Sequence, residues 1–118
     1  HPIQPLKQDR KDRIFQSFIF SLSQNFRTHH SVSFYAAEQC LTPRYFSTIV
    51  REKSGRNALQ WIMMFIIAEA KKLLSDPDPS IKEIAETLGF SNQSFFGRYF
   101  KQYVGLSPMA FRSSGTEE

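Results

Sequence analysis

Apolar residues recur at three- and four-residue intervals along most of this chain, which is the pattern of helices with one buried face. The first such stretch runs from about Arg10 to Arg27. A second stretch, residues 57–75, is apolar on nearly every side at its centre, as a helix packed on two sides would be. Its longest uninterrupted apolar run is too short to cross a bilayer. No strand pattern is visible, so the sequence predicts an all-α protein of about seven helices.

Residues that favour helix starts stand before the other apolar stretches. Thr42 precedes Pro43, and Ser80 is followed three residues later by Glu83, which is the pattern of a capping box. Gly89 is expected to give a turn a positive φ at little cost. Further N-caps are expected at Ser33, Ser91 and Ser107, and helix ends near Cys40, Gly55, Gly89 and Gly105.

The chain contains nearly the same pattern twice. Ala36 in the first copy pairs with Ala85 in the second, and Thr42 pairs with Ser91; after the turn, the separation between partners grows by one residue. Each copy predicts a short helix with a central Ala at a close helix crossing, a tight turn and a longer helix that ends at Gly. This is the pattern of a helix-turn-helix motif. The copies read VSFYAAEQCLTPRYFSTIVREKSG (residues 32–55) and IKEIAETLGFSNQSFFGRYFKQYVG (residues 81–105).

Composition fits a small globular domain with a basic surface. The chain has 118 residues, of which 41% are hydrophobic and 22% charged, and its net charge is +4. The basic excess falls on the second helix of each copy, where it favours nucleic acid as a partner. The one cysteine, Cys40, excludes an internal disulfide and is expected to be a small buried residue at the turn. The chain begins at His1 without Met, which indicates a fragment of a longer protein.

The second helix of each copy carries side chains that can read DNA. Arg and Gln bind guanine and adenine edges in the major groove, and Ser and Thr bind several bases. Basic residues further along each helix, and the hydroxyl residues at its start, suit phosphates. The predicted base-reading residues are Arg44, Ser47, Thr48, Gln93, Ser94 and Arg98. The predicted phosphate contacts are Thr42, Arg51, Lys53, Ser91 and Lys101.

The segment from Ile81 to Arg112 resembles the signature of the AraC/XylS family of bacterial transcription regulators, and residues 34–62 resemble that family's less regular first motif. The resemblance implies a seven-helix domain with two helix-turn-helix units joined by a long helix. It also implies a cytoplasmic, nucleoid-associated activator that contacts RNA polymerase, with an effector bound by a separate N-terminal domain. The expected boundaries are a linker or tag remnant at 1–9, the DNA-binding domain at 10–113 and a tail at 114–118. Within the domain, the motifs are expected at about 33–55 and 80–105 and the joining helix at 57–75.

The family's DNA-contacting positions fall on the same six base-reading residues. Three positions depart from the family pattern. Gln39 replaces a usual Leu, which predicts looser packing of the first short helix. Thr48 replaces a frequent Arg, which predicts weaker base reading by the first motif. Ile66 replaces a frequent Arg on the joining helix, where apolar packing is expected instead.

Two other interpretations of the polar, basic helix faces compete with DNA reading. A polar, basic helix face is often only solvated surface, or it binds an acidic partner protein as part of a helical interaction module. A joining helix of residues 57–75, at about 1.5 Å per residue, would span roughly 28 Å, close to one turn of DNA, which favours two readers. His29 and His30 have no acidic or thiol neighbour in sequence, so neither a metal nor a cofactor is expected. No catalytic pattern is present, and an enzyme is not expected.

Overall fold

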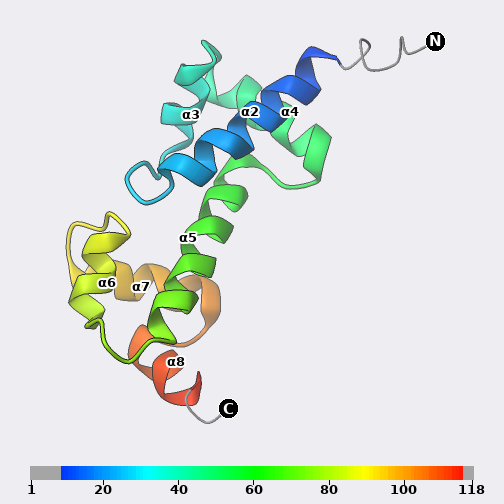
Figure 1. Cartoon of the computed structure of the whole chain (residues 1–118). Coiled ribbons are helices and arrows are strands. Elements are labelled where there is room, and N and C mark those ends of the chain that lie inside the picture. The colour runs from blue at the N-terminus through cyan, green and yellow to red at the C-terminus, as the bar shows by residue number, and fades with distance from the viewer. Residues whose placement is uncertain (1–8, 116–118) are drawn as a thin grey trace. The chain divides into compact units, whose positions relative to one another are not determined.

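The computed structural model describes residues 9–115, which form two compact units meeting between Met63 and Met64 on one helix. The residues outside this range include most of the expected linker and part of the expected tail. Within residues 9–115 the structure has seven helices and no strand, so the all-α prediction is confirmed (Figure 1). The helices are α2 (Arg10–Asn25), α3 (Val32–Glu38), α4 (Pro43–Ser54), α5 (Ala58–Leu74), α6 (Ile81–Thr87), α7 (Gln93–Val104) and α8 (Pro108–Gly115).

The core of the first unit forms where α2 and α3 both pack on α4. The Phe18 ring of α2 is fully buried and meets the rings of Tyr35 and Phe46 edge-on, with centroid distances of 5.5 and 5.1 Å. Edge-to-face contacts of this kind add to the gain from burying the rings. The Tyr35 hydroxyl donates to the His29 carbonyl at 2.7 Å, and burial raises the pKa of Tyr35 to about 12. The Phe18 ring therefore joins α2 to both α3 and α4.

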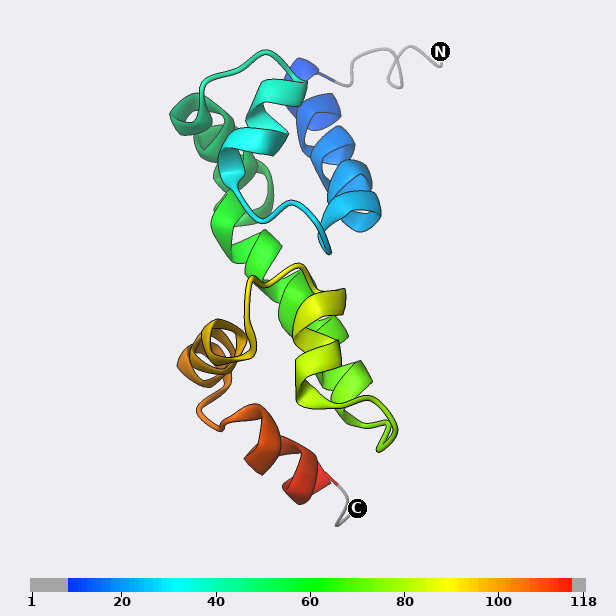
Figure 2. The ribbon, with the colours of Figure 1, turned by 90° about the vertical axis from the view of Figure 1, so that its left-hand side faces the viewer.

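The second unit is also built around aromatic rings, but they come mainly from α7. Phe96 and Phe100 are fully buried, and Phe100 meets Phe111 of α8 at a centroid distance of 5.5 Å. Phe90, in the turn before α7, packs on Phe96 at 5.3 Å. Figure 2 shows α7 nearly end-on, with the chain passing from α6 through this turn into it. The turn thus contributes to the core as well as joining two helices.

The structural repeat extends beyond the two helix-turn-helix motifs, because α5 contributes to both units. The start of α5 matches the start of α8, and its later part matches α2. At the start of α5, the Asn57 side chain accepts from the Gln60 N–H at 2.9 Å, as the Ser107 hydroxyl accepts from the Ala110 N–H at 3.1 Å at the start of α8. The later part of α5 buries residues at positions i, i+4 and i+8, as α2 does. The buried residues are Ile66, Ala70 and Leu74 on α5, and Ile14, Phe18 and Leu22 on α2. Burial of Ile66 agrees with the apolar packing expected there.

Two of the five expected N-caps are wrong by one or two residues. The first short helix is capped by Ser31 and not by Ser33, because the Ser31 hydroxyl accepts from the Phe34 N–H at 3.2 Å. The longer helix of the second copy is capped by Asn92 and not by Ser91, because the Asn92 side chain accepts from the Phe95 N–H at 2.7 Å. Asn92 therefore matches Thr42 of the first copy. Ser91 is the extra residue that lengthens the second turn.

The turns of the two motifs share one left-handed residue. It is Gly89 in the second copy, with φ +82°, as expected, and Cys40 in the first, with φ +58°. After it, Leu41 donates its N–H to the Ala36 carbonyl and Phe90 donates to the Ala85 carbonyl, each at 3.0 Å. This pattern ends a helix with a Schellman-type turn. Cys40 is exposed, so the expectation of a buried thiol is wrong; the left-handed backbone directs its side chain outward.

We predict that Cys40→Gly stabilises the domain by about 0.5–1 kcal/mol. A residue with a Cβ in the left-handed conformation costs roughly 1–2 kcal/mol, which glycine avoids. Part of this stabilisation is lost, because glycine also raises the conformational entropy of the unfolded chain. Urea unfolding would measure the change, and Gly89→Ala, at the matching position, should destabilise by about 1 kcal/mol. A less stable Cys40→Gly variant would show that the turn tolerates the side chain without strain.

We predict that Ala85→Leu lowers the free energy of unfolding by about 1–3 kcal/mol, because a larger side chain at a close helix crossing overpacks it. Ala85 is 1% exposed and Ala36 is fully buried. The melting temperature would measure the loss. Glu86→Leu, on the exposed side of the same helix, is the matched control and should leave the melting temperature nearly unchanged. Equal effects of the two substitutions would contradict a close crossing at Ala85.

Candidate nucleic-acid interface

The longer helices of the two motifs, α4 and α7, are called the recognition helices below. Each has one side in the core of its unit and one side in solvent. Phe46 on α4 and Phe96 on α7 are fully buried. The exposed sides carry five of the six residues predicted to read bases, namely Arg44 and Thr48 on α4 and Gln93, Ser94 and Arg98 on α7. The fold thus presents these five side chains to solvent on the two recognition helices.

The exposed sides also carry cations without protein partners. Arg44 and Arg51 lie on α4, and Arg98 and Lys101 lie on α7; all four are exposed. Within residues 9–115 their side chains make no hydrogen bond or ion pair. An unpaired, hydrated cation keeps its charge available to an incoming anion such as phosphate. Each recognition helix therefore offers two such charges.

Lys53 lies in a different environment from these four cations. Its ammonium group is 2.7 Å from a carboxylate oxygen of Asp12 and 3.6 Å from one of Asp9. The hydrogen bond to Asp12 raises the pKa of Lys53. Nearby, Lys11 of α2 pairs with Glu52 of α4 at 3.1 Å. Although Lys53 is among the predicted phosphate contacts, the structure places it in a group of ion pairs that joins α4 to α2.

Arg112 contributes to the basic charge of the chain but binds within its own unit. Its Nε donates to the Leu74 carbonyl at 3.1 Å, and its Nη2 donates to the carbonyls of Asp76 and Pro79, each at 2.8 Å. Backbone carbonyls at a helix end need such donors. Arg112 therefore anchors α8 to the end of α5 and the loop that follows. Sequence reasoning missed this role, because the carbonyls that Arg112 binds are 33 to 38 residues away in the chain.

Ser47 also makes a contact inside its unit. It is half-buried, and its hydroxyl accepts from the Ala58 N–H at 3.4 Å, at the start of α5. The matching residues of the second unit are Gly97, which has no hydroxyl, and Pro108, which has no N–H. The donor and the acceptor are thus both present in one unit and both missing in the other. Ser47 sets the position of α4 against α5, which distinguishes it from the five exposed base-reading candidates.

The starts of the recognition helices hold the remaining predicted contacts. The Thr42 hydroxyl is exposed and accepts from the Tyr45 N–H at 3.2 Å, which caps α4. Ser91 is exposed beside the cap of α7. It borders a hollow of about 520 Å³ between α6 and the start of α7, together with Asn92, Gln93 and Ser94. Asn92 was missed by sequence reasoning because Ser91 is an equally good N-cap residue.

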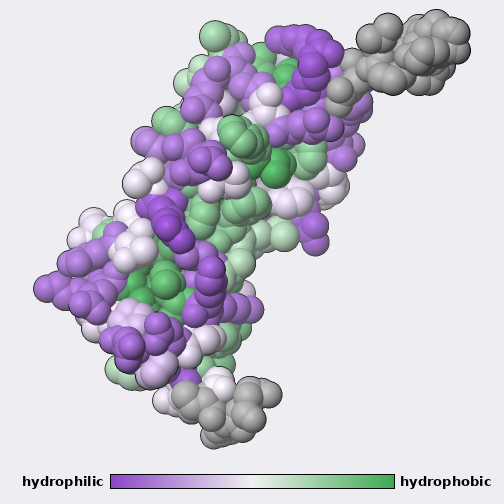
Figure 3. Space-filling model, viewed as in Figure 1, coloured by the Kyte–Doolittle hydropathy of each residue, from purple (hydrophilic) through white to green (hydrophobic). Residues whose placement is uncertain are grey.

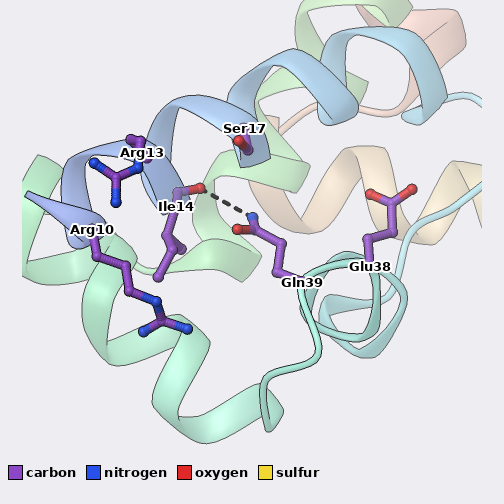
Figure 4. A pocket seen from close by; sticks show the side chains of 6 residues that line it. All are labelled: Arg10, Arg13, Ile14, Ser17, Glu38 and Gln39. Carbon is purple, nitrogen blue, oxygen red and sulfur yellow. Dashed lines mark hydrogen bonds between the residues drawn. The ribbon is translucent and has the colours of Figure 1, made fainter.

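A second hollow, of about 600 Å³, lies in the first unit between α2 and α3 (Figure 4). The Gln39 amide donates to the Ile14 carbonyl at 3.1 Å across its floor. Gln39 is half-buried, whereas Leu88, at the matching position of the second unit, is fully buried. This open packing agrees with the looseness expected from a polar residue at this position. Arg10 and Arg13 border the hollow on the α2 side and Glu38 on the other.

Comparison with known proteins decides the family. A family model described as a helix-turn-helix domain matches residues 35–114. The arabinose operon regulatory protein of Escherichia coli is 37% identical over 83 residues, which cover 70% of this chain and 28% of that protein. Its counterpart in Salmonella typhimurium is 34% identical over 86 residues, covering 73% and 31%. The chain belongs to the AraC-type helix-turn-helix family. It spans less than a third of the length of these two relatives.

Solved structures agree with membership of the AraC-type family. The DNA-binding domain of AdpA, solved in complex with a target DNA, is 26% identical, with a TM-score of 0.72 over 86% of this chain and 90% of that one. The C-terminal domain of AraT, a response regulator from Geobacillus stearothermophilus, has a TM-score of 0.81 at 23% identity, over 90% and 88%, and supports the fold alone. Proteins of the AraC-type family are DNA-binding transcription regulators and not enzymes. In the described part of the chain, no helix has the length and apolarity to cross a membrane.

We predict that Arg51→Gln and Lys53→Gln affect different properties of this AraC-type domain. Arg51→Gln should weaken DNA binding and reduce the slope of log K against log salt by about 0.9, as the loss of one phosphate contact would. Lys53→Gln should leave that slope unchanged and instead lower the melting temperature, most at low salt, because it breaks the ion pairs with α2. Titrations of binding and unfolding at several salt concentrations would measure both. A reduced slope for Lys53→Gln would show instead that Lys53 contacts a DNA phosphate.

Proposed function

We propose that this domain binds a specific double-stranded DNA site by placing α4 and α7 in the major groove. The observation that carries the proposal is that each recognition helix presents unpaired cations beside polar side chains that can read bases. Basic side chains supply most of the affinity of a protein for the phosphate backbone, and polar contacts to base edges supply selectivity. Both kinds of group are exposed on both recognition helices.

The exposed side chains are assigned either to the base edges in the groove or to the DNA backbone. Arg44, Thr48, Gln93, Ser94 and Arg98 are proposed to contact bases, with Arg favouring guanine and Gln favouring adenine. The residues proposed to contact the backbone are Thr42, Arg51, Ser91 and Lys101. Ser47 is proposed to act indirectly, by holding α4 against α5.

The two recognition helices are not proposed to read DNA equally. On α7 three polar side chains, Gln93, Ser94 and Arg98, are exposed and make no hydrogen bond within the described residues. On α4 the Thr48 hydroxyl donates to the Arg44 carbonyl at 3.0 Å, so its hydrogen is already used within the helix. We therefore assign most of the base selectivity to the second unit.

The wider biological role rests on the relatives. The two arabinose proteins reported above are named operon regulators. We therefore propose that this domain directs a larger protein to promoters, where it activates transcription by contacting RNA polymerase. Any effector would bind a part of such a protein outside this domain, and we place the protein in the cytoplasm at the nucleoid. A reporter gene placed behind the selected site would test activation. Reduced expression in the presence of the protein would make it a repressor.

Selection of bound duplexes from a random pool tests the proposed DNA binding. Enrichment of one short sequence would support it. A pool that stays random, together with tight binding to an acidic protein, would instead support the interaction module that the same cations allow.

We predict that Arg98→Ala lowers the affinity for the selected site by about 1–3 kcal/mol and relaxes the preference at one base pair, because a bidentate contact to guanine is lost. Lys101→Ala, one turn along the same helix, is the control. It should weaken binding to selected and scrambled duplexes by similar factors, as a phosphate contact would. Competition binding with the two duplexes would measure both variants. Uniform weakening by Arg98→Ala would remove it from the base-reading set.

A further inference from the structure

The second unit has a hollow of about 250 Å³ directly beside its base-reading side chains. One wall is formed by Gln93, Ser94 and Gly97 at the start of α7, and the other by Pro108 and Met109 at the start of α8. Ile81 of α6 borders it too. Two of the residues proposed to contact bases thus also line the hollow, which is continuous with the proposed DNA interface.

Gly97 lines the hollow without a side chain of its own. A Cβ built at Gly97 would meet no atom within 4 Å, so the space beside the helix backbone is empty. The matching residue of the first unit is Ser47, whose hydroxyl binds the start of α5. In the second unit a hydroxyl at this place would lack the donor that Ser47 has, because Pro108, the residue that matches Ala58, has no N–H. The sequence therefore keeps the space open on one recognition helix and uses it for a helix–helix contact on the other.

The lining of the hollow is mainly apolar, which is unusual at the edge of a surface that binds phosphate. Met109 is 62% exposed at its rim. Figure 3 shows an apolar area within the hydrophilic surface over α6 and α7. The apolar group that DNA presents in the major groove is the C5-methyl group of thymine. Methionine is flexible and polarizable, so Met109 can close over a group much smaller than the hollow.

We propose that this hollow receives the methyl group of a thymine in the half-site bound by the second unit. Gly97, by leaving the space, and Met109, by covering it, are then specificity-determining residues. The proposal rests on the proposed DNA binding. It extends that function from hydrogen bonding of base edges to the recognition of one methyl group. The first unit carries Leu59 at the position of Met109, but the Ser47 hydroxyl stands where Gly97 leaves room, so no equivalent preference is expected there.

Deoxyuridine substitution tests the proposal, because it removes only the methyl group of thymine. Each thymine of a duplex selected from the random pool is replaced in turn, and the half-site of the second unit is identified by the base preference that Arg98→Ala relaxes. Loss of one buried methyl group should weaken binding about fourfold at one thymine of that half-site. A selected half-site without thymine, or one in which every thymine can be replaced without loss, would overturn the proposal.

Two variants and one control link the effect to the hollow. Met109→Ala and Gly97→Ser should each lower affinity for the thymine duplex about fourfold and leave the affinity for the deoxyuridine duplex unchanged, so that the two duplexes bind alike. Leu59→Ala, the matched change in the first unit, should preserve the difference between duplexes. Melting temperatures confirm that all three variants are folded.

Persistence of the full thymine preference in both variants of the second unit would show that the methyl group is read elsewhere and would overturn the proposal. This failure differs from failure of the proposed function. If no duplex is enriched from the pool, DNA reading itself is refuted. If a duplex is enriched but its methyl groups have no effect, only the hollow is excluded as a thymine site.

Discussion

The arrangement of both motifs depends on how closely the short helix can approach the recognition helix. At Ala36 and Ala85 the only side chain is a methyl group, and both residues are buried. The left-handed residue four positions later, Cys40 or Gly89, then turns the chain back toward the next helix. The apolar residue after it is half-buried in the first unit (Leu41) and buried in the second (Phe90). These two constraints orient each recognition helix with its aromatic side inward. Its cationic side faces solvent as a consequence.

Much of this fold follows from the sequence by local rules. Thr42 before Pro43 and the capping box from Ser80 to Glu83 both start helices where expected, because each satisfies free N–H groups of the first turn. The errors in the helix starts arose where two nearby residues were both suited to cap the helix. Ser91 and Asn92 are adjacent and both residue types cap helices well, and in the structure Asn92 stands at the helix start.

The candidate site was less accessible from sequence, because the environment of a charge depends on residues distant in the chain. Arg51 and Lys53 are two residues apart on one helix, yet only Lys53 meets the carboxylates of α2. Ser47 has a hydroxyl that is suited to base contact, and its hydrogen bond from the Ala58 N–H becomes visible only when α5 is placed. The exposed positions of Ser94 and Arg98 could be predicted, because their spacing puts them opposite Phe96 and Phe100, whereas Gln93 is exposed as the first residue of α7.

The continuity of α5 has a consequence for the way the two units fold. Starting a helix is unfavourable, because several residues must be ordered before the first hydrogen bond forms, whereas extending one is cheap. Once the first unit has ordered the start of α5, the turns that carry Ile66, Ala70 and Leu74 grow from an existing nucleus. The second unit is thereby spared a nucleation step that an independent copy would have to make. A shared helix thus couples the folding of the two halves of the repeat through the backbone.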